Sequence, residues 1–138
     1  MFSLYGNGNK KQLLWDACKK ISNSRDEVTF LGTGNETRDF IHISDVLNLF
    51  DRVIRRNDKF LIINGGTGIK STVKSVVEML REIINTNVKI SFNNQVNPGN
   101  PLYYWADIHK LINYDFKAKK KFKQELINYV EWVKSLDD

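Results

Sequence analysis

The chain has 138 residues, of which 41% are hydrophobic and 27% are charged, a composition typical of one globular domain with a buried core. We therefore treat residues 1–138 as a single domain. The net charge is +5, from 21 basic and 16 acidic residues. Because the sequence has no apolar run of membrane-spanning length and no signal-peptide pattern, we expect a cytoplasmic protein without membrane contact.

The single cysteine, Cys18, excludes an internal disulfide and suits a reducing compartment. It lies among Leu14, Ala17 and Ile21 at helical spacing. This spacing favours a buried structural thiol over a nucleophile.

The first half of the chain alternates between predicted helices and strands. Apolar spacing predicts a helix over 10–22, and short apolar or alternating runs predict strands over 28–31 and 38–43. Ser44 is expected to cap the next helix, with Asp45 near its positive end. That helix is expected to turn six apolar side chains inward: Val46, Leu47, Leu49, Phe50, Val53 and Ile54.

The second half continues the alternation, which indicates the α/β class. An apolar run over 59–64 predicts a strand buried on both faces. Ser71 or Thr72 is expected to cap a helix that reaches Ile84, and a strand over 88–92 and a polar loop over 93–101 follow it. A short helix is predicted near 107–112 and a last helix over 122–136.

Two segments of the sequence suggest a binding function, but each has a simpler interpretation. The 65–71 segment resembles a phosphate-binding P-loop, but Ile69 separates the last glycine from Lys70, which favours an ordinary strand-to-helix turn. Five lysines crowd residues 117–123, flanked by Phe116 and Phe122. Without interleaved exposed aromatics, this segment favours a solvated loop, and we expect no nucleic-acid partner.

Three polar residues are candidates for chemistry. Arg38, taken alone, is as consistent with a surface ion pair to Glu36 or Asp39 as with a guanidinium that binds phosphate oxygens. His42 lacks a nucleophile beside it, so a structural, hydrogen-bonded role is favoured over a catalytic relay. His109 has no partner at metal-ligand spacing, and we predict no metal site.

Six segments in order resemble one known family. These are Phe2-Ser3-Leu4-Tyr5-Gly6, Phe30-Leu31-Gly32-Thr33-Gly34, Arg38-Asp39-Phe40-Ile41-His42-Ile43 with Asp45, Ile63-Asn64-Gly65-Gly66-Thr67-Gly68, Tyr104-Trp105-Ala106-Asp107 and Tyr129-Val130-Glu131-Trp132. Together they resemble the C-terminal half of the extended short-chain dehydrogenases/reductases, specifically the NAD-dependent nucleotide-sugar epimerases and dehydratases. The resemblance implies the C-terminal portion of a Rossmann-type fold, with a small mixed sheet, flanking helices and no N-terminal dinucleotide-binding motif.

The resemblance also implies a site for a nucleoside-diphosphate sugar. Arg38 would hold the diphosphate, Phe2 would meet the nicotinamide side of NAD, and Ser3 stands where the family has an asparagine. The strand before the glycine turn would line the base pocket. The substrate-binding residues implied in this way are Ser3, Thr29, Leu31, Arg38, Asn97 and Asn100, of which Asn97 and Asn100 replace a family arginine and aspartate.

Two family motifs are missing from the sequence. The Gly-x-x-Gly-x-x-Gly turn that holds NAD does not occur, and no tyrosine is followed by lysine four residues later. We therefore assign no catalytic residue, leave open whether the chain is an enzyme, and expect a truncated binding part that is not catalytic alone. The base, the sugar and the reaction stay open.

The expected truncation has a consequence for association. Without the nucleotide-binding sheet of the family, the helix after Asp45 and the strand over 60–64 would expose an apolar face. We therefore expect self-association or a partner chain that carries the N-terminal half. The alternatives are a non-catalytic interaction module that retains the fold and a basic nucleic-acid-binding domain.

Overall fold

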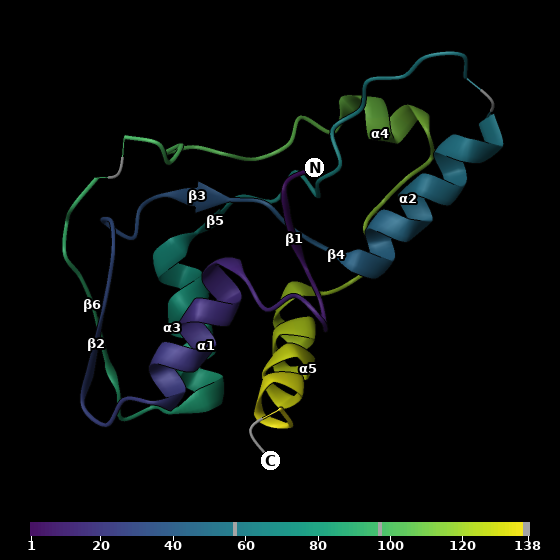
Figure 1. The fold of residues 1–138 in the computed structure, drawn as a ribbon. Helices are drawn as coiled ribbons and strands as arrows, with labels where there is room; N and C mark the ends of the chain where they lie inside the picture. Colours follow the sequence, from purple (N-terminus) through teal and green to yellow (C-terminus); the bar gives the residue numbers. More distant parts are fainter. Residues whose placement is uncertain (57, 97, 137–138) are drawn as a thin grey trace.

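The computed structural model describes residues 1–56, 58–96 and 98–136. Helices and strands alternate in it, which confirms the α/β class (Figure 1). The elements are β1 (Ser3–Tyr5), α1 (Gln12–Ser22), β2 (Glu27–Phe30), β3 (Thr37–Arg38), β4 (Phe40–His42), α2 (Ile43–Arg56), β5 (Ser71–Thr72), α3 (Val73–Ile84), β6 (Lys89–Phe92), α4 (His109–Asn113) and α5 (Phe122–Lys134).

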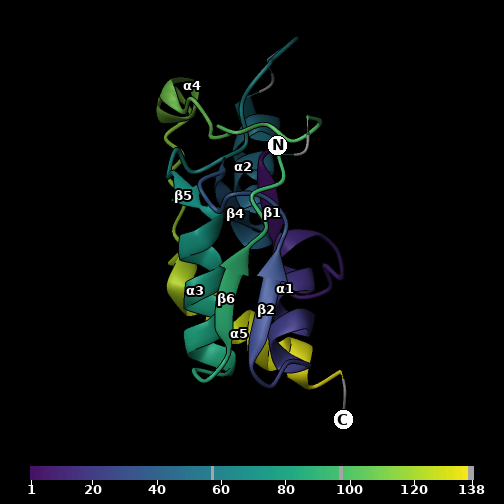
Figure 2. The same cartoon turned by 90° about the vertical axis from the view of Figure 1, so that its left-hand side faces the viewer.

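The described strands pair in three short ladders, two parallel and one antiparallel. β1 pairs with β4 in parallel, from Ser3 opposite Phe40 to Tyr5 opposite His42. β2 pairs with β6 in parallel, and Figure 2 shows these two strands side by side in front of α1 and α3. β3 and β5 form the antiparallel pair. The pairing is therefore mixed, as expected.

The larger core lies where α1, α3 and α5 meet, with β2 and β6 alongside α1 and α3 (Figure 1). α1 buries Leu14, Ala17, Cys18 and Ile21, as their helical spacing predicted. α3 buries Val73, Val76, Val77 and Leu80, whereas Ile83 and Ile84, also expected on its inner side, are only partly buried. Thr72 caps α3 by accepting a hydrogen bond from the Ser75 N–H at 3.1 Å. Cys18 is 1% exposed, which confirms the structural interpretation of the thiol. Burial raises the pKa of Cys18 to about 12.

The smaller core corrects the prediction for α2. Val46 and Leu49 are buried against α4, but Leu47, Phe50 and Ile54 are 60%, 51% and 76% exposed. The helix is apolar on more than one side, and the described residues cover only one of them. The six side chains predicted to point inward therefore divide between a buried and an exposed face.

The predicted strand over 59–64 is wrong. The structure has no strand there: residues 59 and 60 form a bend, residues 61–64 have no regular secondary structure, and Phe60 and Ile62 are 81% and 67% exposed. Sequence pattern reports strand preference, but a strand also needs a neighbour, and no described strand runs beside this segment.

Two details at the start of α2 also differ from prediction. The predicted strand over 38–43 is interrupted at Asp39, between β3 and β4. Ser44 lies inside α2 rather than capping it, because the Nδ1 atom of His42 accepts from the Ser44 N–H at 3.2 Å. Asp45 is in the first turn as expected, and its carboxylate accepts from the N–H groups of Lys119 and Lys120, both at 3.1 Å.

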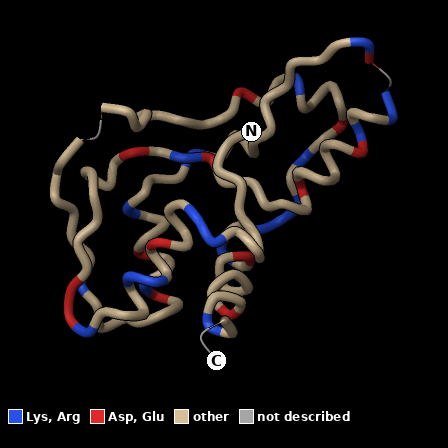
Figure 3. Tube along the Cα trace, in the orientation of Figure 1, with Lys and Arg blue, Asp and Glu red and all other residues tan. Residues whose placement is uncertain are grey.

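The lysine-rich connection between α4 and α5, whose lysines are blue in Figure 3, is held to the fold by hydrogen bonds. Asp45 holds its backbone, and the Lys120 ammonium pairs with Glu125 at 2.9 Å. Phe116 is buried and Phe122 packs on the larger core, so both flanking aromatic rings anchor the connection. None of the helices in the part of the chain that the structure describes is long and apolar enough for a bilayer crossing.

Candidate functional site

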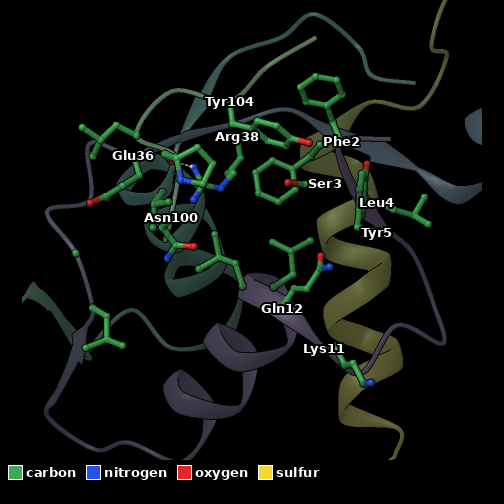
Figure 4. A pocket seen from close by; sticks show the side chains of 18 of the residues that line it. Phe2, Ser3, Leu4, Tyr5, Lys11, Gln12, Glu36, Arg38, Asn100 and Tyr104 are labelled. Carbon is green, nitrogen blue, oxygen red and sulfur yellow. Dashed lines mark hydrogen bonds between the residues drawn. The ribbon is translucent and has the colours of Figure 1, made fainter. Parts of the chain in front are cut away.

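A cavity of about 710 Å³ lies between β1, the start of α1, the 31–38 segment and the loop that leads to Tyr104. Its volume is in the range of small-molecule sites. Most of the predicted site residues line it together: Phe2, Ser3, Leu31, Arg38 and Asn100 (Figure 4).

Two predicted residues are not part of this described lining. Asn97 lies outside the described residues. Thr29 is on the exposed face of β2, because Val28 and Phe30 take the buried face. Its hydroxyl lies 2.9 Å from the Ser91 hydroxyl, and its role at a base pocket stays a prediction.

Arg38 is half-buried at the cavity wall, and backbone oxygens hold one end of its guanidinium. The Nη1 atom donates to the carbonyl oxygens of Thr37 at 2.7 Å and Pro101 at 2.8 Å. Among the described residues, neither Glu36 nor Asp39 forms an ion pair with it. The remaining N–H groups of the guanidinium are therefore available to an anionic ligand in the cavity.

Glu36 turns its carboxylate to the glycine turn beside the cavity. Its Oε1 atom accepts from the backbone N–H and hydroxyl of Thr33 at 2.9 and 3.1 Å, whereas Oε2 is buried and has no hydrogen-bond partner among the described residues. Burial raises the pKa of this carboxyl, but hydrogen bonds from the turn outweigh it, and the pKa lies below its ordinary value. Glu36 is therefore an ionised structural group of the turn.

The cavity contains residues that sequence reasoning missed. The Tyr104 ring lies over the Phe2 ring, with centroids 4.5 Å apart and planes at 30°. Tyr104 belongs to a segment that carried the family resemblance, so a signal for it was present. Lys11 and Gln12 also line the cavity, at the start of α1, and no pattern in the sequence identified them.

The two histidines lie away from this cavity. His42 pairs with the Ser44 hydroxyl at 2.8 Å and approaches Glu125 at 3.8 Å, which confirms that its ring is hydrogen-bonded. Burial lowers the pKa of His42. His109 pairs with Asp107 at 2.6 Å on the surface. Within the described ranges, no cluster of three or more side chains is suited to hold a metal ion.

Comparison with known proteins gives a family match over residues 1–66 and fold matches over nearly the whole of this chain. Residues 1–66 match the model of the NAD dependent epimerase/dehydratase family. The chain is 27% identical over 141 residues to an uncharacterized UDP-glucose epimerase of Bacillus subtilis, covering 98% of this chain and 43% of the relative. It is 24% identical over 110 residues to GDP-L-fucose synthase 1 of Arabidopsis thaliana, covering 80% of this chain and 34% of the relative.

A solved structure extends the comparison to the whole fold. UDP-glucose 4-epimerase from Thermotoga maritima, in complex with UDP-glucose, superposes with a TM-score of 0.85 at 18% identity, over 99% of this chain and 45% of that chain. This likeness shows the fold. The chain therefore spans about a third to just under half of the length of these proteins, and the expected resemblance is confirmed.

Proposed function

We propose that this chain, which is similar to part of the NAD-dependent nucleotide-sugar epimerases and dehydratases, binds a nucleoside-diphosphate sugar in the cavity beside Arg38. One observation carries the proposal: a guanidinium held at one end by backbone oxygens lines a cavity of suitable size. An arginine fork suits phosphate oxygens, because two parallel N–H groups match their spacing.

Neutral groups would complete the site. The Ser3 hydroxyl and the Asn100 amide line the same cavity and can exchange hydrogen bonds with phosphate or sugar oxygens. Leu31 adds an apolar surface for the base. Because Asn97 and Asn100 replace charged family residues, we expect weaker diphosphate binding than a second guanidinium would give.

The fit to NAD is incomplete within residues 1–138. Phe2 is the residue that would meet the nicotinamide, and the sequence contains neither the glycine-rich NAD turn nor the Tyr-x-x-x-Lys pair. NAD, when bound to the family fold, supplies hydride transfer. We propose that this chain's part in that chemistry is to bind and orient the substrate, in a reducing cytoplasm that suits its free thiol.

A second candidate function is an interaction module, which a specific surface favours. We name the exposed side chains Leu47, Phe50, Ile54, Phe60 and Ile62 the outer apolar face. The spacing of Leu47, Phe50 and Ile54 places them on one side of α2, and large exposed apolar side chains that gather on one side commonly mark an interface. We propose that this face is covered by self-association or by polypeptide carrying the N-terminal half of the family fold.

Calorimetric titration with UDP-, GDP- and dTDP-sugars tests the binding function. We expect Arg38→Ala to raise the dissociation constant at least tenfold, since a charge-assisted hydrogen bond contributes about 1.5–3 kcal/mol. Arg55→Ala is the matched control, because Arg55 pairs with Asp51 on the surface of α2. The proposal fails if no nucleotide sugar binds at millimolar concentration, or if both variants bind alike.

Binding measured over a series of salt concentrations tests the remaining alternative, a basic nucleic-acid-binding domain. Binding to nucleic acid with a steep loss of affinity as salt rises would favour a basic nucleic-acid-binding domain. Nucleotide-sugar binding that depends on Arg38 would exclude that interpretation of the cavity.

A further inference from the structure

We infer that Asp39 is a positioning residue that fixes the walls of the cavity without touching the ligand. As far as it concerns the ligand, this inference rests on the nucleotide-sugar binding proposed above. Its structural part rests on the contacts of one buried carboxylate.

The Asp39 carboxylate is fully buried and accepts hydrogen bonds from backbone N–H groups and one hydroxyl. Its Oδ1 atom accepts from the N–H and hydroxyl of Thr67 at 2.9 and 2.5 Å. Its Oδ2 atom accepts from the N–H groups of Gly68 at 2.8 Å and Ala106 at 3.1 Å. An ionised carboxylate is an acceptor only, so it suits a site where every neighbour donates.

These donors belong to two segments far apart in the sequence: the 65–68 turn, which lies outside the cavity lining, and the segment that ends at Ala106, which carries lining residues. The 65–68 turn holds β1, because the Gly65 carbonyl oxygen accepts from the Phe2 N–H at 3.0 Å. The backbone carbonyl oxygen of Asp39 itself accepts from the Ser3 N–H at 2.9 Å. Asp39 therefore connects the turn, β1 and the segment that ends at Ala106.

The 100–106 segment carries Tyr104 and Asn100 into the cavity lining, and residues 37–39 hold it at three places. Arg38 holds the Pro101 carbonyl oxygen, and the Thr37 N–H donates to the Leu102 carbonyl oxygen at 2.8 Å. The Asp39 carboxylate holds the far end at Ala106. Because side chains of adjacent extended residues point to opposite faces, Arg38 can face the ligand while Asp39 faces away from it.

The packing around Asp39 excludes a direct role in chemistry. A Cβ atom on Gly66 would lie 2.7 Å from Asp39 Oδ2 and 2.5 Å from the Ala106 Cβ atom, so this region has no room for a ligand group. Asp39 is also outside the residues that line the cavity. It can influence binding only through the segments that it holds.

The test compares Asp39→Asn with Asp45→Asn. Asp45 is a matched control, because it is also a buried carboxylate that accepts two backbone N–H bonds, but from Lys119 and Lys120 outside the cavity. We expect Asp39→Asn to raise amide hydrogen exchange over 102–106 at least tenfold and the dissociation constant for UDP-sugars at least tenfold. We expect Asp45→Asn to raise exchange near 119–120 and to leave that constant within twofold.

The outcomes are distinguishable. Unchanged exchange over 102–106, unchanged affinity, or equal loss of affinity in both variants would overturn the inference. If the native chain binds no nucleotide sugar, the proposed function fails, and the exchange data alone decide whether Asp39 fixes the segment. If Asp39→Asn does not fold, Thr67→Val removes only the Thr67 hydroxyl donor, and we expect a smaller rise in exchange at Ala106; no rise would overturn the inference.

Discussion

The Nη1 atom of Arg38 lies 2.8 Å from the carbonyl oxygen of Pro101, 63 residues further along the chain. The same nitrogen donates to the Thr37 carbonyl oxygen at 2.7 Å. These two contacts set the side-chain conformation of Arg38 before any ligand arrives. A guanidinium that is already ordered loses less conformational entropy when it binds an anion.

This arrangement predicts that lysine cannot replace Arg38. A lysine keeps the charge, but a single ammonium cannot hold the Pro101 carbonyl oxygen and present a fork to phosphate at once. We expect Arg38→Lys to weaken binding of a nucleoside diphosphate about tenfold, or about 1.4 kcal/mol, and to leave binding of the bare nucleoside unchanged. Calorimetry with both ligands measures the difference, and equal weakening of the two would contradict a phosphate contact.

Lys11 offers a second test of the cavity's charge. It lines the cavity, whereas its neighbour Lys10 does not, so Lys10→Ala is a control of equal charge. Because an exposed ammonium is screened by solvent, we expect Lys11→Ala to weaken diphosphate binding only a few-fold, and less at high salt. Equal affinity of the two variants would show that Lys11 does not contact the ligand.

His42 predicts a loss of stability on mild acidification. Burial lowers its pKa in the folded chain, and Lys120 adds to the effect, whereas Glu125 and Asp45 oppose it. The unfolded chain then binds the proton more readily. The stabilising contribution of neutral His42 to the free energy of unfolding is fully present above about pH 6.5, the pKa of an unperturbed histidine. It is lost as the pH falls from there through the lower pKa of His42 in the folded chain.

Urea unfolding at pH 7.5 and 5.5 measures this slope. We expect His42→Gln, which keeps an acceptor for the Ser44 N–H, to flatten the dependence in this window. The carboxyls of Glu36 and Glu125 have lowered pKa values and stay ionised there. An unchanged slope in the variant would rule out His42 as its source.

Substitution of the adjacent glycines Gly65 and Gly66 is expected to lower the free energy of unfolding by different amounts. A Cβ atom on Gly66 would meet the Ala106 Cβ atom at 2.5 Å and the held Asp39 carboxylate, which cannot move aside. On Gly65 it would meet mainly the end of the exposed and flexible Met1 side chain. We expect Gly66→Ala to lower the free energy of unfolding by about 1–3 kcal/mol, and Gly65→Ala to lower it by less. Chemical denaturation compares them, and equal costs would mean that the Gly66 neighbourhood relaxes.

The outer apolar face predicts association. We expect light scattering to show oligomers or a complex, and the dye ANS to bind the free chain, because large apolar side chains are exposed there. Phe50→Glu should reduce both signals, whereas Ile69→Glu, at an exposed residue of the 65–71 turn, should not. A clean monomer that binds no dye would refute the role of this face.

The sequence was a good guide wherever local pattern decides the structure. Spacing located α1, α3 and α5, because each buries one stripe that the helical period reveals. It was a poor guide where burial depends on a distant neighbour, as for Phe50 and for the irregular segment around Phe60. The cap of α2 was missed because a histidine ring nitrogen took the place of the expected serine hydroxyl.

At the candidate site, too, the sequence identified some residues but not the long-range contacts that hold them. Family resemblance identified Arg38 and the residues around Phe2, because they occur in recognisable segments. The contacts that hold them could not be predicted, since Pro101 and Ala106 reach residues 38 and 39 only through the folded path of the chain. The start of α1 belongs to none of the segments that resemble the family, so only the structure shows that Lys11 lines the cavity.

Cys18 gives this chain a chemical reporter that needs no engineering. Its thiol is 1% exposed between α1 and the helices that cover it, and its pKa of about 12 keeps it protonated. The thiolate is the nucleophile that attacks a reagent such as a maleimide, so a buried and protonated thiol reacts only when the helices separate. The rate at which a maleimide labels the native chain therefore measures how often its larger core opens.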